Sequence, residues 1–267
     1  QVKIIECPRD ALQGVREFIP TAAKAAYVNA LLGVGFDTVD FGSFVSPKAI
    51  PQMRDTAAVL SQLDLSETRS KLLAIVANTR GARDAATFEE IDFLGFPFSV
   101  SEIFQMRNTQ KTIEQSLGVL DEVLNIAVVA NKKVVTYLSM GFGNPYGEPW
   151  ALELVGKWTQ KLTEMGVEIL SLSDTIGTAT PANISYLFSH LIPQYPAVEF
   201  GAHLHTSYTS WKPKVEAAFQ AGCLRFDGAI QGHGGCPMAN DELIGNMPTE
   251  KLLSYFASQQ IATGTKP

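Results

Sequence analysis

Apolar residues recur in short runs along the whole chain, and each run is followed by a longer segment with helical spacing. The apolar runs predict strands at residues 2–6, 38–41, 72–77, 90–100, 134–140, 167–172, 198–203 and 224–229. The intervening segments predict helices at residues 21–32, 52–63, 80–90, 109–130, 150–165, 181–191, 212–221 and 249–259. Strand and helix therefore alternate eight times.

This alternation places the chain in the α/β class. Eight β–α units in about 250 residues favour the (β/α)8 barrel, or TIM barrel. An open doubly wound sheet is the alternative that periodicity alone does not exclude. Because no Gly/Ser/Pro-rich linker interrupts residues 1–267, we expect a single domain.

Composition narrows the possible functions. The chain is 46% hydrophobic and 18% charged, which is enough apolar material for a large core. A net charge of −6, with no basic run longer than Lys132-Lys133, argues against a nucleic-acid binder. Three cysteines suit reduced thiols in a cytosol-like compartment. No signal peptide or membrane span is visible, since residues 1–5 already look like a strand.

Unusual polar residues follow the predicted strands. In such barrels the active site forms at the carboxyl ends of the strands, so these side chains are expected to share one rim. They follow strands one, two, six, seven and eight, and they are Arg9, Asp10, Asp40, Ser43, Asp174, Thr175, His203, His205, Cys236 and Asn246.

Two of the four histidines, His203 and His205, stand two residues apart at the end of a predicted strand. If the strand continues to residue 205, both side chains project from the same face, as two metal ligands require. The alternative is a pair of strand-end histidines bonded to neighbouring loops.

The chemistry of this rim follows from the residue types. Asp10, both histidines and the amide oxygen of Asn246 would form a mixed nitrogen and oxygen shell suited to Mg²⁺, Mn²⁺ or Zn²⁺. Arg9 could stabilise a developing enolate oxygen. Cys236, in a glycine-rich loop, is either an acid or base or a small apolar residue in a tight turn.

These residues resemble the hydroxymethylglutaryl-CoA lyase family, one branch of the metal-dependent barrel lyases and condensing enzymes that include isopropylmalate and homocitrate synthases. The resemblance covers almost the whole chain. It rests on the segments at residues 7–13 (CPRDALQ), 42–48 (GSFVSPK), 173–177 (SDTIG), 203–205 (HLH), 234–237 (GGCP) and 245–246 (GN).

The resemblance implies retro-Claisen cleavage of 3-hydroxy-3-methylglutaryl-CoA to acetyl-CoA and acetoacetate. It implies Mg²⁺ or Mn²⁺ as cofactor, an acyl-CoA substrate, and a homo-oligomer, dimeric or larger. It also implies a bacterial cytoplasm, or a mitochondrial matrix after removal of a transit peptide. The roles it implies are metal ligation by Asp10, His203, His205 and Asn246; catalysis by Arg9, Asp10, Asp40, Asp174 and Cys236; and substrate binding by Gln13, Ser43 and Thr175.

The sequence also departs from the family's pattern. Ala11 replaces a glycine, Asp40 a glutamate, Asn144 a cysteine and Thr206 an aspartate, and His233 occupies a usually apolar position. The chain ends soon after residue 264, where relatives continue, so the carboxyl end is expected to be shortened. The departures leave two alternatives: a lyase or aldolase for another 3-hydroxyacyl-CoA or hydroxy acid, and a catalytically silent barrel that binds CoA esters.

Overall fold

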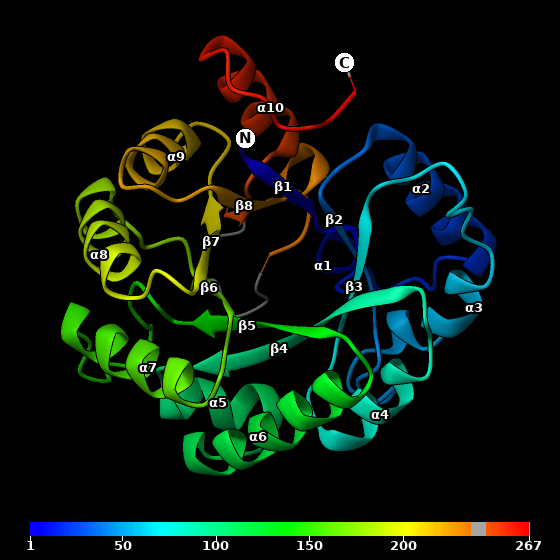
Figure 1. The fold of residues 1–267 in the computed structure, drawn as a ribbon, viewed down its shortest axis with the longest axis horizontal. Helices are drawn as coiled ribbons and strands as arrows, with labels where there is room; N and C mark the ends of the chain where they lie inside the picture. Colours follow the sequence, from blue (N-terminus) through cyan, green and yellow to red (C-terminus); the bar gives the residue numbers. More distant parts are fainter. Residues whose placement is uncertain (236–243, 267) are drawn as a thin grey trace.

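A closed ring of eight parallel strands, surrounded by helices, forms the fold in a computed structural model that describes residues 1–235 and 244–266 (Figure 1). Each strand pairs with its neighbours in sequence, and the pairing of β1 with β8 closes the ring. The predicted (β/α)8 barrel is therefore confirmed. Its strands are β1 (Lys3–Glu6), β2 (Thr38–Ser43), β3 (Lys71–Ile75), β4 (Ile91–Ser99), β5 (Lys133–Ser139), β6 (Ile169–Asp174), β7 (Glu199–Thr206) and β8 (Arg225–Gly228).

Most of the helices lie around the outside of the ring (Figure 1). Local sequence sets several of their starts: Thr112 and Thr180 each form a capping box, and Pro181 occupies the first turn, as predicted. The helices are α1 (Pro8–Leu12), α2 (Thr21–Val34), α3 (Thr56–Leu60), α4 (Thr79–Ala86), α5 (Glu102–Thr109), α6 (Ile113–Val129), α7 (Leu152–Glu164), α8 (Pro181–Gln194), α9 (Trp211–Gln220) and α10 (Thr249–Ser258).

Two apolar layers hold the barrel together. The larger lies between the outer faces of the strands and the helices, and the smaller fills the inside of the ring with Leu73, Ile75, Phe93, Val135 and Ile169. Among the residues described, none of the helices is both long and apolar enough to span a membrane.

Three details of the prediction are wrong. The helix predicted at 52–63 is a 3-10 turn, Pro51–Met53, followed by the short helix α3, because Asp55 leaves helical geometry between them. The helix predicted at 109–130 begins at Ile113, because Gln110 adopts a left-handed conformation and ends a separate helix, α5. A short strand, β9 (Gly245–Asn246), was not predicted at all.

Strand β7 runs three residues beyond its predicted end, to Thr206. This extension places both His203 and His205 within regular strand structure. It also allows β9 to pair with β7 in antiparallel orientation, so that Asn246 lies opposite His205.

Replacing Glu6 by glutamine is expected to remove a pH-dependent loss of stability. Glu6 is fully buried, and burial raises its pKa from 4.5 to about 7, although hydrogen bonds from the Thr249 hydroxyl and the Ile230 N–H oppose this. The folded pKa lies above the unfolded one. The contribution of Glu6 to the free energy of unfolding is therefore complete below pH 4.5 and is lost as the pH rises through 7. The loss is on the order of 3 kcal/mol.

Urea unfolding of the wild type and the Glu6→Gln variant between pH 4.5 and 8.5 measures this effect. The variant should gain stability relative to the wild type as the pH rises. Glu114→Gln, at an exposed position on α6, is the matched control and should show a constant difference. A constant difference for Glu6→Gln as well would contradict the prediction.

Candidate metal and active site

The short helix α1 carries the first group of predicted site residues. It begins at Pro8 directly after β1, and the fixed φ of proline suits the first turn of a helix. Arg9, Asp10 and Gln13 therefore lie at the carboxyl end of β1, where the barrel opens. The Arg9 Nη1 donates to Gln13 Oε1 at 2.9 Å, and Gln13 Nε2 donates to Asp10 Oδ1 at 2.8 Å.

Asp10, His203 and His205 come together as one cluster. Each offers a ligand atom, and these atoms all lie within 4.8 Å of one another. The Nε2 atom of His203 is 3.8 Å from Asp10 Oδ2, and the two imidazole centroids are 5.4 Å apart. The structure thus brings together three of the four residues that the resemblance implies as metal ligands, and the alternation of side chains along β7 is the reason.

His205 has an unsatisfied nitrogen within this cluster. Its Nδ1 lies 2.9 Å from the carbonyl oxygen of Thr175, an arrangement in which Nδ1 carries the proton. Its Nε2 is buried and has no hydrogen-bond partner among the described residues. Burial and the neighbouring His203 lower the pKa of His205, which favours the neutral ring. A buried imidazole nitrogen with a free lone pair is what a metal ligand requires.

Asp10 is held in its charged form. Burial alone would raise its pKa, but Arg9 and the two imidazoles outweigh burial and hold the pKa below its ordinary value. A hydrogen bond from Asn246 acts in the same direction. Asn246 also donates from Nδ2 to the carbonyl oxygen of His233 at 2.8 Å. The amide of Asn246 therefore lies beside the cluster, and the donor set of one carboxylate, two imidazoles and one amide fits a divalent cation.

Arg9 in α1 and Asp40 in β2 form a buried ion pair. Arg9 Nη2 lies 2.6 Å from Asp40 Oδ2, and Nε is within 3.2 Å of both carboxylate oxygens. Burial raises the pKa of Asp40 to about 6, while the guanidinium opposes that rise, so the carboxylate is charged at pH 7 and above. Asp40 consequently orients Arg9, whose Nη1 also lies 3.3 Å from Asp10 Oδ1.

Asp174 forms an ion pair with Lys214, a residue that was not predicted from the sequence. The ammonium group of Lys214, on α9, donates to Asp174 Oδ2 at 2.9 Å and to the carbonyl oxygens of His205 and Gly177. Asp174 Oδ2 also accepts the backbone N–H of Ala179 at 3.0 Å. Lys214 therefore ties the loop after β6 to the end of β7, next to a candidate metal ligand.

The predicted substrate-binding residues lie at the same rim, engaged in local hydrogen bonds. Gln13 bridges Arg9 and Asp10. The Ser43 hydroxyl contacts the carbonyl oxygen of Ile75 at 3.4 Å. The Thr175 hydroxyl accepts the N–H of Met140 at 2.8 Å. Their contact with substrate stays a prediction.

Cys236 lies outside the described residues, but the loop that leads to it contacts the cluster. Gly234 has a φ of 83°, and a Cβ atom at this position would lie 2.5 Å from the Asp10 carbonyl oxygen and 2.9 Å from Asn246 Nδ2. Both the conformation and the space therefore require glycine. The backbone of Gly234 therefore lies against the candidate metal site.

Two further residues of the site were not predicted. Asp227, on β8, lies 3.0 Å from His203 Nδ1, and the ring of Tyr137, on β5, packs edge-on against His203 at a centroid distance of 5.5 Å. The only sequence sign of Asp227 was a carboxylate within the strand predicted at residues 224–229. Tyr137 carries no comparable sign, because aromatic residues are common in strands.

Four of the atypical positions have local roles. Asn144 closes its own loop by accepting the N–H groups of Tyr146 and Glu148. The Thr206 hydroxyl donates to the carbonyl oxygen of Ser207 at 3.0 Å. The imidazole of His233 contacts Gln231 at 3.1 Å, and its main chain supports Asn246. Ala11, in α1, lies against Gly234.

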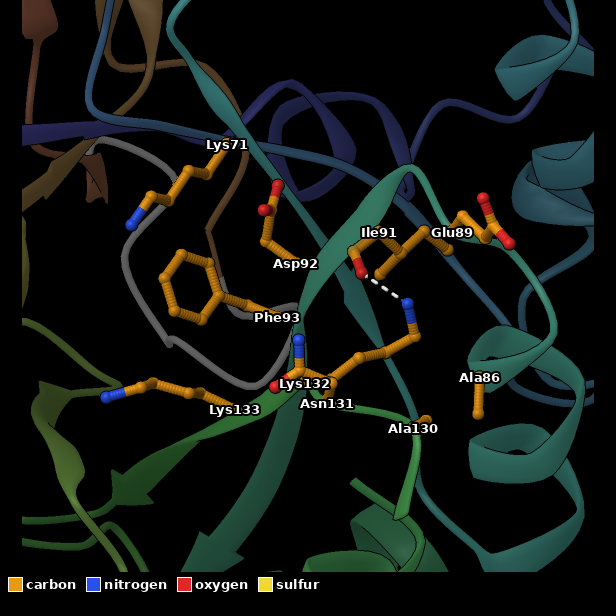
Figure 2. A pocket seen from close by; sticks show the side chains of 10 residues that line it. All are labelled: Lys71, Ala86, Glu89, Ile91, Asp92, Phe93, Ala130, Asn131, Lys132 and Lys133. Carbon is orange, nitrogen blue, oxygen red and sulfur yellow. Dashed lines mark hydrogen bonds between the residues drawn. The ribbon is translucent and has the colours of Figure 1, made fainter. Parts of the chain in front are cut away.

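A hollow of about 420 Å³ at the opposite end of the barrel is not part of this site. Figure 2 shows that it is lined by residues at or near the amino ends of β3, β4 and β5, including Lys71, Asp92 and Lys133. Lys132 there donates to the carbonyl oxygens of Ile91 and Phe88, both at 2.6 Å. The hollow is lined by both acidic and basic side chains, and Lys132 is bonded to main-chain carbonyl oxygens. These features indicate that its lining residues have a structural role.

The fold and cluster define a class: a (β/α)8 barrel with a candidate metal site of nitrogen and oxygen ligands at the carboxyl ends of its strands. Within that class, the HMGL-like family model matches residues 1–267, and the chain belongs to this family.

Similar proteins agree with this assignment. The chain is 34% identical to hydroxymethylglutaryl-CoA lyase YngG of Bacillus subtilis, over 97% of this chain and 86% of that protein. It is 34% identical to the mitochondrial hydroxymethylglutaryl-CoA lyase of Bos taurus, over 99% and 81%. A solved HMG-CoA lyase from Acenitobacter baumannii, in complex with coenzyme A and 3-methylmalate, superposes with a TM-score of 0.90 at 28% identity, covering 99% of this chain and 86% of that one.

Proposed function

We propose that this protein is a metal-dependent carbon–carbon lyase that cleaves 3-hydroxy-3-methylglutaryl-CoA into acetyl-CoA and acetoacetate. The observation that carries the proposal is the cluster of Asp10, His203 and His205 beside Arg9, in a chain whose relatives are lyases of this substrate. One similar HMG-CoA lyase was solved in complex with coenzyme A, and this supports an acyl-CoA substrate for the present protein.

Asp10, His203, His205 and Asn246 are the residues that would hold Mg²⁺ or Mn²⁺. A cation bound there supplies Lewis acidity toward hydroxyl, carbonyl and carboxylate oxygens. The buried Nε2 of His205, which has no hydrogen-bond partner in the described part of the chain, is the structural reason to propose a ligand atom at this point. The amide of Asn246 lies opposite His205 through the pairing of β9 with β7.

The reaction begins when a base removes the proton of the 3-hydroxyl group. The electron pair of the O–H bond then forms the carbonyl of acetoacetate, and the carbon–carbon bond pair moves onto the thioester fragment as an enolate. Arg9 is placed to stabilise the enolate oxygen, with its geometry fixed by Asp40. Protonation of the enolate carbon gives acetyl-CoA, and we assign this proton to Cys236. Asp174 supports the rim through Lys214, while Gln13, Ser43 and Thr175 contact substrate.

Incubation with 3-hydroxy-3-methylglutaryl-CoA tests the proposal. We expect equal amounts of acetyl-CoA and acetoacetate with Mg²⁺ or Mn²⁺, and none after chelation by EDTA. Cleavage that persists fully in EDTA would contradict the role of the metal. The absence of product with either metal would contradict the substrate.

A related lyase for another 3-hydroxyacyl-CoA is the second candidate. Asp40 favours it, because its carboxylate is one methylene shorter than the glutamate usual in the family. A displacement of about 1 Å in an active site can change turnover a hundredfold. A panel of 3-hydroxyacyl-CoA esters of different 3-substituents distinguishes the two candidates by their kcat/KM.

The remaining predictions concern assembly and compartment. The relatives include a bacterial protein and a mitochondrial protein. We propose a homo-oligomer, dimeric or larger, and light scattering of the purified protein tests this. We also propose a bacterial cytoplasm or a mitochondrial matrix as the compartment.

A further inference from the structure

Asp227 lies inside the barrel, beneath the candidate metal site. It is located on β8 with 3% of its surface exposed, and its Oδ2 is 3.0 Å from Nδ1 of His203. Its Oδ1 is buried without a hydrogen-bond partner among the described residues. The carboxylate is therefore directed at His203 rather than at solvent.

This contact determines which nitrogen of His203 can bind a cation. A carboxylate accepts a hydrogen bond, so the proton of a neutral His203 lies on Nδ1. The lone pair is then on Nε2, the atom that lies 3.8 Å from Asp10 Oδ2. His205 shows the same arrangement, with its Nδ1 beside the Thr175 carbonyl oxygen. Nδ1 of each candidate ligand is thus held by an oxygen atom, which leaves the lone pair of each ring on Nε2.

Arg225 is a second buried charged residue on the same strand as Asp227. It stands two residues earlier on the same strand, so both side chains point into the barrel. Arg225 is 1% exposed, and its Nη1 lies 3.3 Å from Glu199 Oε1, while Nε and Nη2 have no partner among the described residues. Burial lowers the pKa of Arg225, but Asp227 more than offsets this together with other acidic neighbours. Asp227 therefore favours the charged form of Arg225 inside the barrel.

We infer that Asp227 is a positioning residue for the metal site: it fixes the tautomer and ring orientation of His203 so that Nε2 faces Asp10. A carboxylate behind a ligating imidazole commonly tunes both its orientation and its strength as a ligand. The inference rests on the proposed function, since it concerns the same metal site.

Metal affinity measured without substrate is the first test. Titration of the substrate-free protein with Mn²⁺ in a calorimeter should show affinity about 10 to 100-fold weaker in Asp227→Asn than in the wild type, because asparagine can present its amide N–H to His203 and select the wrong tautomer. Ser171→Ala is the matched control. Ser171 is equally buried inside the barrel, and its hydroxyl has no partner among the described residues. The Mn²⁺ affinity of Ser171→Ala should match that of the wild type.

Affinity of Asp227→Asn within twofold of the wild type would overturn the inference. The lyase activity of the wild type is measured separately, so failure of the proposed function is distinguishable: a wild type that binds Mn²⁺ yet cleaves no substrate contradicts the function alone.

Nitrogen-15 NMR of the wild type supplies a second test that does not depend on the folding of a variant. The chain has only four histidines, so a histidine-labelled sample gives few imidazole signals to assign. In metal-free protein at pH 8, His203 should carry its proton on Nδ1. A proton on Nε2 would contradict the inference.

Discussion

Replacing Arg9 by methionine is expected to lower kcat about 100 to 1000-fold, with little change in KM. The side chain of Arg9 is mostly buried, and its donors engage Asp40, Asp10 and Gln13. In the proposed reaction it stabilises charge that develops on the thioester oxygen only as the carbon–carbon bond breaks. An interaction that strengthens in the transition state has a larger effect on kcat than it has on substrate binding.

Steady-state kinetics of Arg9→Met and Arg9→Lys measure this effect. The lysine variant keeps the charge but not the planar pair of donors, so it should recover only part of the activity. Arg80→Met is the control, because the Arg80 side chain is 91% exposed on α4. Its kinetics should match those of the wild type.

Mn²⁺ titration of Arg9→Met separates two possible roles. Removal of a positive charge next to the site reduces repulsion of a cation, so affinity should stay the same or increase. A loss of affinity as large as the loss of kcat would show instead that Arg9 acts by orienting Asp10. Wild-type kcat in Arg9→Met would contradict any role in catalysis.

Replacing Lys214 by methionine is expected to destabilise the fold by about 3 to 5 kcal/mol. Lys214 is 5% exposed, and its ammonium group satisfies Asp174 and the carbonyl oxygens of His205 and Gly177. Methionine fills a similar volume but leaves a buried carboxylate and two carbonyl oxygens without their donor. Urea unfolding at pH 7.5 measures the change.

Lys212→Met is the matched control for this prediction. Lys212 lies on the same helix, α9, with an exposed side chain that pairs with Glu216 at 3.6 Å. An exposed pair of this kind contributes less than about 1 kcal/mol. The double variant Lys214→Met/Asp174→Asn should recover part of the stability, since it removes the unpaired charge. Equal effects of the two lysine variants would contradict the importance of the buried pair.

The spatial proximity of residues could be predicted where they are close together in sequence or lie at equivalent strand ends. The alternation along β7 predicted that His203 and His205 share a face, and the strand order placed Asp10 near them. Hydrophobic periodicity predicted the eight strands and the helices that follow them, because each is a local property of the chain. Asn246 was a candidate ligand because it follows the eighth predicted strand, and the resemblance implies the same role.

Pairs that depend on three-dimensional packing could not be predicted. Lys214 lies in a helix whose pattern gives no sign that its charge is buried against Asp174, 40 residues away. Asp227 meets His203 only after β8 closes on β7. The two-residue strand β9 is too short for a hydrophobic pattern, and its pairing with β7 determines where Asn246 lies. Long-range contacts of this kind follow from barrel closure rather than from local sequence.

The position of a bound Mn²⁺ ion tests the metal site most directly. Anomalous diffraction from crystals grown with Mn²⁺ should show one peak coordinated by Asp10, Nε2 of both His203 and His205, and Asn246, with ligand distances of roughly 2.0 to 2.3 Å. A second group, Cys7, His203 and Asp227, also has ligand atoms within 4.8 Å of one another, but burial and nearby carboxylates raise the pKa of the Cys7 thiol and so disfavour the thiolate. A peak at that second group, or no peak within reach of His205, would contradict the proposed site.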